Sequence, residues 1–123
     1  MRTGGFVYIM TNKPMGTLYI GSTSNLEQRI WKHKNEFYKS FTKKYGIKQL
    51  VYYEFHESLE RMVQRERQMK EWKRDWKLAR IIEVNPGWKD LFDEFSERVI
   101  DLMEQYEQYP EYHQDILPRK IPK

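Results

Sequence analysis

The sequence contains no cysteine, so its 123 residues form no disulfide and offer neither a thiolate nucleophile nor a cysteine-ligated zinc site. No apolar run approaches the roughly 20 residues that a membrane-spanning helix needs. The first residues also lack the apolar core of a signal peptide, and no repeat or low-complexity segment is visible. These absences favour a soluble, cytoplasmic protein without a membrane partner, of a length typical of one domain.

Positive charge is concentrated in the first two thirds of the chain. Residues 1–86 hold 17 Lys and Arg against 9 Asp and Glu, a net charge of +8, whereas residues 87–123 hold 5 against 9, a net charge of −4. The first part therefore has the electrostatics of a polyanion-binding protein, although many basic proteins bind no nucleic acid. A hydrophobic content of 39% with 15% aromatic residues predicts a folded core.

Three short strands are predicted. Phe6–Met10 and Thr17–Gly21 alternate in the direction of their side chains and are joined by a segment rich in turn-forming residues, which favours an antiparallel hairpin. Leu50–Phe55 is rich in β-branched and aromatic residues and predicts a third strand. The basic stretch over 39–48 is predicted to be a connection without regular structure.

Two helices are predicted to carry most of the polar residues of interest. The first runs from about Ser24 to Tyr38 and begins with a capping box made by Ser24 and Glu27. The second begins after the N-cap Ser58 and continues to about Arg74.

The rest of the chain predicts two further helices and a tail. A helix over 76–84 is ended by Asn85, Pro86 and Gly87, because the residue before proline is disfavoured in helical geometry. The expected organisation is an α/β domain over 1–86, with a small, mainly antiparallel sheet covered by helices. A helix over 88–109 is expected to pack on this domain within a segment 87–109, and 110–123 forms an extended tail.

Glu66 is out of place in the pattern of the 58–74 helix, because the other positions of its inner stripe are mostly apolar: Leu59, Met62, Val63, Met69 and Trp72. An unpaired buried carboxylate costs several kcal/mol, so Glu66 needs a partner. Two partners are open, an ion pair with Lys70 one helical turn later or a divalent metal such as Mg²⁺. Periodicity alone favours the ion pair.

Four further polar residues are candidates for chemistry. Arg29 and His33 are one helical turn apart, so either they are an ordinary solvated face or they bind a phosphate and exchange a proton beside it. Tyr8 and Tyr19 lie on neighbouring predicted strands. They either pack as a cross-strand pair or bring two hydroxyls to one site.

Basic residues interleaved with Trp72 and Trp76 suit a surface that follows a nucleic acid strand, or form an ordinary solvated face. They are Arg65, Arg67, Lys70, Lys73, Arg74, Lys77 and Arg80. The residues selected here as candidate nucleic-acid contacts are Lys32, Lys34, Lys70, Lys73, Arg74 and Lys77.

Taken in order, these residues resemble the GIY-YIG nuclease family. The second signature triplet is intact as Tyr19-Ile20-Gly21, whereas the first is Phe6-Val7-Tyr8, in which only the tyrosine is kept. Arg29, His33 and Glu66 follow in the family's order. The resemblance covers roughly residues 5–92 and is to the small, stand-alone bacterial members.

By this resemblance, the fold is a three-stranded antiparallel sheet flanked by helices, and the activity is metal-dependent cleavage of DNA. Glu66 is then the protein ligand of Mg²⁺ or Mn²⁺, which reverses the preference for the ion pair. Tyr8 orients or deprotonates the attacking water with the support of Tyr19. Arg29 stabilises charge on the phosphate, and His33 assists as a hydrogen-bond partner or proton carrier.

Two positions depart from the family's repair-type members. Ser22 stands where they carry a lysine, and Leu78 stands where they carry an asparagine, with Asn85 near but out of register. An endonuclease, structure-specific or acting in repair or recombination, is therefore weighed against a catalytically silent nucleic-acid-binding module of the same fold. The acidic helix over 88–109 is a candidate surface for self-association.

Overall fold

The computed structural model describes residues 4–35 and 41–92 and contains one three-stranded sheet. Its strands are β1 (Gly5–Thr11), β2 (Leu18–Thr23) and β3 (Gln49–His56), in the order β2-β1-β3. Both pairings are antiparallel. The predicted α/β fold with a small antiparallel sheet is confirmed. Among the described residues, every helix is too short or too polar to span a membrane.

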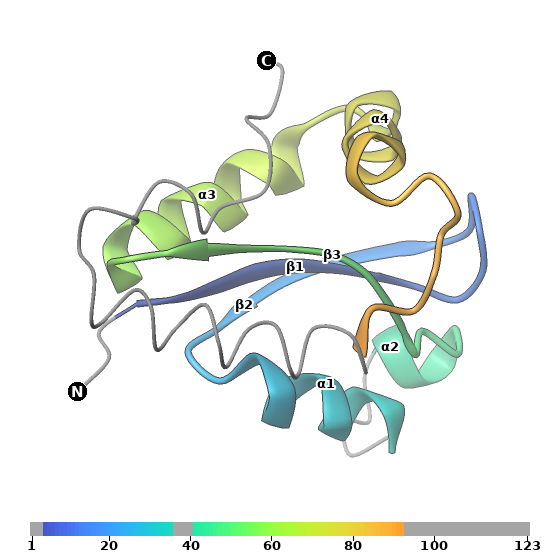
Figure 1. The fold of residues 1–123 in the computed structure, drawn as a ribbon, viewed down its shortest axis with the longest axis horizontal. Helices are drawn as coiled ribbons and strands as arrows, with labels where there is room; N and C mark the ends of the chain where they lie inside the picture. The colour runs from blue at the N-terminus through green and yellow to red at the C-terminus, as the bar shows by residue number, and fades with distance from the viewer. Residues whose placement is uncertain (1–3, 36–40, 93–123) are drawn as a thin grey trace.

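Within these two ranges, four helices cover the two faces of the sheet: α1 (Leu26–Lys34), α2 (Phe41–Lys44), α3 (Leu59–Glu71) and α4 (Arg74–Val84). Helices α1 and α2 lie on one face, and α3 and α4 lie on the other (Figure 1). Because side chains alternate along each strand, the three strands contribute apolar side chains to a separate core on each face of the sheet.

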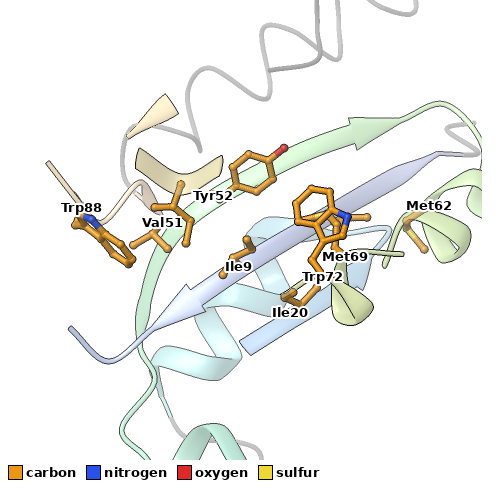
Figure 2. Close-up of a cluster of buried hydrophobic side chains, with 10 residues drawn as sticks. Ile9, Ile20, Val51, Tyr52, Met62, Met69, Trp72 and Trp88 are labelled. Atoms are coloured by element: carbon orange, nitrogen blue, oxygen red, sulfur yellow. The ribbon is translucent and has the colours of Figure 1, made fainter. Parts of the chain in front are cut away.

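The first core lies under α1 and contains Phe6, Tyr8, Met10, Leu26, Ile30, Ile47, Leu50 and Phe55, with Tyr19 packed against it. The second core lies under α3 and α4 (Figure 2) and contains Val7, Ile9, Ile20, Val51, Tyr52, Met62, Met69, Trp72, Ile81 and Trp88. The alternation predicted for β1 and β2 is therefore confirmed, with both tyrosines of the hairpin on the α1 side.

A buried carboxylate lies beside the second core. Glu54 of β3 accepts hydrogen bonds from the Tyr52 hydroxyl and, at 2.9 Å, from Nε of Arg65, and it pairs with His56. Nε of Arg80, itself buried, donates to the Tyr52 hydroxyl over 3.1 Å. Burial opposes ionisation, but the hydrogen bond from His56 and the charge of Arg65 together hold the pKa of Glu54 below its usual value.

The start of α1 differs from the prediction. Asn25, not Ser24, is the N-cap, and its side chain accepts a hydrogen bond from the Gln28 amide. Reciprocal contacts between Thr23 and Asn25 fix the preceding turn, so the helix begins one residue later than expected. The helix ends at Lys34, and 36–38 lie outside the described residues.

The helices after α1 also depart from the prediction in places. Residues 41–44 form α2 inside the segment expected to lack regular structure. The Ser58 cap is confirmed, because its side chain accepts from the Arg61 amide, but α3 stops at Glu71 and α4 begins at Arg74. The stripe of α3 that faces the sheet is narrower than predicted, since Leu59 and Val63 are exposed.

The break at 85–87 is confirmed, but residues 88–91 are not helical as predicted. Trp88 has a φ of +52°, and the Leu91 amide donates to the Leu50 carbonyl over 2.8 Å. The Asp90 side chain accepts from the Leu50 amide, so this segment is held against the start of β3. The rest of the predicted helix over 88–109 and the tail 110–123 lie outside the described residues.

Candidate active site

Glycine at position 21 makes room for the first tyrosine. Tyr8 of β1 pairs with Gly21 of β2, and a Cβ placed on Gly21 would lie 2.5 Å from the Tyr8 hydroxyl oxygen. Tyr19 pairs with Met10, so the two tyrosines are diagonal neighbours rather than a direct cross-strand pair. Their ring centroids are 6.3 Å apart. The hairpin therefore brings both rings to one patch on the α1 side of β2.

His33 of α1 completes this patch. Its Nε2 lies 3.2 Å from the Tyr8 hydroxyl, its Nδ1 lies 3.2 Å from the Thr42 hydroxyl of α2, and its ring packs edge-on to Tyr19 at 5.4 Å. Burial, and then the charge of Arg29, lower the pKa of His33 to about 4. His33 is therefore neutral at pH 7. Tyr8 is fully buried beside it, whereas Tyr19 is only half-buried.

The pKa of His33 predicts a specific loss of stability in acid. Between pH 6.5 and about 4 the unfolded chain binds a proton at His33 that the folded chain does not, so the free energy of unfolding falls as the pH falls, by up to about 3 kcal/mol. Urea unfolding from pH 7 to pH 4 measures this loss, and the His33→Gln variant should lose less by that amount. A His33 ring that titrates near pH 6.5 by NMR would contradict this expectation.

Glu66 lies on α3, on the opposite side of the sheet from the tyrosines. One carboxylate oxygen accepts a hydrogen bond from the Ser22 hydroxyl of β2, and the other lies 2.6 Å from the Lys70 ammonium. The ion pair considered from the sequence is thus present. Burial opposes ionisation, but the hydrogen bonds from Lys70 and Ser22, with the charges of Lys70 and Arg29, hold the pKa of Glu66 below its usual value.

Arg29 connects the two sides of the site. Its charge lowers the pKa of His33 on the tyrosine side and that of Glu66 on the α3 side. Because β2 is at an edge of the sheet, groups on its two faces can meet around that edge. Tyr8, Tyr19 and His33 are in contact on the α1 side of the sheet, and Ser22 of β2 holds Glu66 on the other side. The charge of Arg29 acts on both His33 and Glu66.

Residues 4–79 match the GIY-YIG catalytic domain. That range is more than half of the chain and contains the five residues that the sequence selects together, Tyr8, Tyr19, Arg29, His33 and Glu66. The chain belongs to the GIY-YIG family. This places it in a family of nucleases and confirms the resemblance drawn from its motifs.

Three UPF0213 proteins are similar to this chain. A UPF0213 protein of Clostridium perfringens is 36% identical over 97 residues, which are 79% of this chain and 98% of the relative. A UPF0213 protein of Staphylococcus saprophyticus is 36% identical over 78 residues, 63% of this chain and 94% of the relative. The solution NMR structure of a UPF0213 protein from Bacillus halodurans has a TM-score of 0.46 at 24% identity, over 72% of this chain and 93% of that chain. The names of these relatives specify no reaction.

Glu66 is the only one of the five site residues of this GIY-YIG domain with a carboxylate. Within 4–35 and 41–92, no group of three or more His, Asp or Glu side chains is arranged to hold a metal ion. A metal at Glu66 would therefore take its other ligands from water and phosphate. This arrangement suits Mg²⁺, which keeps several waters and often binds only one or two protein carboxylates.

The six candidate nucleic-acid contacts are not equivalent in the GIY-YIG domain. Lys34 donates to the Lys48 carbonyl over 3.0 Å and pairs with Asp90, so its charge is already used to hold the segment after α4. Lys32 lies three residues after Arg29 on α1, and Lys70 pairs with Glu66. The others, Lys73, Arg74 and Lys77, surround the start of α4.

Sequence reasoning missed two hydroxyls of the site. Ser22 appears there only as a departure from the family, because the predicted strand ends at Gly21, yet it holds Glu66. The strand in fact continues to Thr23, and extending its alternation would have put Ser22 on the same face as Ile20. Thr42, which holds His33, gave no signal because α2 was not predicted.

The two positions near the family's asparagine have structural roles. Leu78 packs against the second core. The Asn85 amide donates to the carbonyls of Val51 and Lys89, over 3.1 and 2.9 Å, and so ties the end of α4 to β3.

Adding a methyl group at Gly21 is expected to destabilise the GIY-YIG domain. In Gly21→Ala the new Cβ meets the hydroxyl and ring carbon of Tyr8 at 2.5 and 2.7 Å, and overpacking of this kind costs about 1–3 kcal/mol. Gly87→Ala is the matched control, since its Cβ meets nothing closer than 3.7 Å. Urea unfolding compares the two variants, and equal stabilities would show that Tyr8 does not need this space.

Proposed function

We propose that the chain is a divalent-metal-dependent DNA endonuclease. The observation that carries this proposal is the assembly around β2 of two tyrosines and a neutral histidine on one face and an ionised glutamate on the other, with Arg29 acting on both. Metal-assisted hydrolysis of a phosphodiester requires a source of positive charge, an ionised metal ligand and a hydroxyl near the attacking water. These residues supply each of them.

Glu66 is the residue that would hold Mg²⁺ or Mn²⁺. Its carboxylate is ionised, and its side chain is 20% exposed, so it is open to solvent. Lys70, whose side chain is 54% exposed, can turn into solvent when another cation binds. When bound, the metal supplies Lewis-acid polarisation of a phosphate oxygen and neutralises developing charge.

Of the other residues, some would contact the water or the phosphate, and the rest would hold those residues in position. The Tyr8 hydroxyl is buried against His33, so we assign the contact with the attacking water to the half-buried Tyr19. Within the described part of the chain, the Tyr19 hydroxyl makes no hydrogen bond, which leaves it available to a water or substrate. Tyr8 and His33 then position the Tyr19 ring, and Arg29 stabilises charge on the phosphate through its fork of donors.

A second candidate is a DNA-binding module without turnover. The observation that favours it is that both oxygens of Glu66 already have partners, Ser22 and Lys70. If this pairing persists when DNA is bound, the basic residues still attract the phosphate backbone but no metal is held. Such a module would bind DNA with strong salt dependence and leave it uncut.

Cleavage assays on several DNA forms distinguish the two candidates. Supercoiled plasmid, single-stranded oligonucleotides and branched junctions are incubated with Mg²⁺ or Mn²⁺, and with EDTA as control. Metal-dependent nicking is expected, and preference for the junctions would indicate a structure-specific role of the kind used in repair or recombination. Salt-sensitive binding of all three forms without any cleavage would instead support the binding module.

A further inference from the structure

A pocket of about 660 Å³ lies between the β1–β2 turn and the start of α4, away from the site residues described above. Its lining is Asn12, Lys13, Met15, Gly16, Thr17, Leu18, Arg74 and Lys77. Three of these side chains are cations and none is acidic. Across the described residues, none of the three cations pairs with a carboxylate.

Arg74 fixes the wall of the pocket. Its Nη2 donates to the carbonyls of Met15 and Gly16 over 2.7 and 2.8 Å, which joins the turn to α4. The turn is closed by the Gly16 amide bonding to the Lys13 carbonyl, and Met15 adopts a φ of +59°, a conformation that disfavours a side chain. Nε and Nη1 of Arg74 have no partner among the described residues, so the guanidinium keeps donors for a ligand.

Three positive charges held close together in the pocket favour the binding of an anion. Burial, and then the charge of Arg74, lower the pKa of Lys77. An anion between these groups would relieve that repulsion, and a phosphate matches the donors of an arginine and two lysines.

The pocket is in line with Glu66 along the edge strand. Helix α3 runs beside β2, with Glu66 next to Ser22 and, after the helix ends, Arg74 next to Gly16. Leu18 and Ser22 are four residues apart in β2, so the pocket and Glu66 are separated by roughly 13 Å at about 3.3 Å per residue. Phosphates of one duplex strand advance about 3.4 Å per nucleotide along the axis but lie farther apart in space because the strand winds, so this separation corresponds to a few nucleotides.

We propose that this pocket, with Lys13, Arg74 and Lys77, binds a phosphate of the DNA strand a few nucleotides from the scissile bond. The proposal rests on the proposed function for its substrate and deepens it. It makes the turn a second anchor for the strand, with Lys70 lying between the two phosphate positions. A strand that ends before the pocket is therefore a poor substrate.

Binding without cleavage tests the pocket separately from the enzyme. The ¹⁵N-labelled full chain is titrated in EDTA with inorganic phosphate and with a single-stranded oligonucleotide. Amide shifts are expected within 12–18 and 74–77 for both ligands. In the Lys13→Gln/Lys77→Gln double variant these shifts should be lost. Oligonucleotide affinity at low salt should fall about tenfold or more, and the steepness of log K against log salt should fall by about 1.4, since each contact to a single strand contributes about 0.7.

The Lys43→Gln variant is the matched control, because this exposed lysine lies on α2 on the other side of the sheet. It should keep the shifts and the affinity of the wild type. Shifts confined to other parts of the chain, or equal affinity of the double variant and the control, would overturn the proposal. Pocket shifts in a protein that cuts no DNA would support the phosphate site while the endonuclease proposal fails.

The strand-length requirement is tested with DNA substrates that the protein cleaves, each shortened stepwise from one end or the other. In the wild type, the rate should fall about tenfold or more once one side of the cleaved bond becomes too short to place a phosphate in the pocket, which is expected within the first few nucleotides. The Lys13→Gln/Lys77→Gln double variant should be indifferent to the same shortening. An equal dependence on length in both proteins would overturn the proposed register.

Discussion

Replacement of Glu66 by glutamine is expected to reduce metal-dependent cleavage at least about 10³-fold, because the metal contributes several kcal/mol to the transition state and Glu66 is its proposed protein ligand. Glutamine keeps the size of the side chain and still accepts the hydrogen bond from Ser22. The partly exposed pair with Lys70 stabilises the fold by only about 0–1 kcal/mol, so Glu66→Gln should remain folded.

A control variant and a metal-binding measurement accompany the cleavage assay. Glu71→Gln is the control, since it is the same change on the same helix at an exposed residue without a partner in the described part of the chain. Mn²⁺ should broaden the amide signals around 22 and 66 in the wild type but not in Glu66→Gln. Cleavage that survives in Glu66→Gln would place the metal elsewhere or reveal a contaminating nuclease.

Removal of the buried carboxylate by Glu54→Ala is expected to cost about 3–5 kcal/mol of stability. The substitution leaves Arg65 and the Tyr52 hydroxyl without their shared acceptor, and breaking one side of a buried charge network costs this much. Small domains are stable by only about 5–15 kcal/mol, so a large share of the total is at stake.

Urea unfolding at pH 7 measures the effect. Glu54→Gln should cost less than Glu54→Ala, because the amide oxygen still accepts from Tyr52 or Arg65. Glu71→Ala removes an exposed carboxylate and should change stability by no more than about 0.5 kcal/mol. A loss below about 1 kcal/mol in Glu54→Ala would show that the surrounding groups find water or one another instead.

The parts of the structure that follow from local pattern could be predicted from the sequence. Alternation along β1 and β2 put Tyr8 and Tyr19 on the same face, and helical spacing put Arg29 next to His33. The Lys70 partner of Glu66 follows from the same helical spacing. Each of these relations spans only a few residues or one hairpin.

Other features depend on packing between distant segments and had no local signal. The hydrogen bond from Ser22 to Glu66 spans 44 positions, and the helix that carries Thr42 is only four residues long. The tie between Asp90 and the Leu50 amide replaces the helix that the pattern predicted at 88–91. A long-range partner decides the geometry at Glu66 and at Asp90, whereas α2 is too short to give a periodic signal.

The position of the site on both faces of β2 has a consequence for local opening of the fold. If α3 detaches while α1 stays docked, the Tyr8–His33 contact survives but Glu66 leaves, and detachment of α1 does the reverse. Neither partly open form holds the complete set, so the site exists only when both layers are closed. Segments of a protein open with different free energies. Cleavage activity would therefore report on the closure of the whole domain, and a destabilising change in either core should lower activity before the chain unfolds globally.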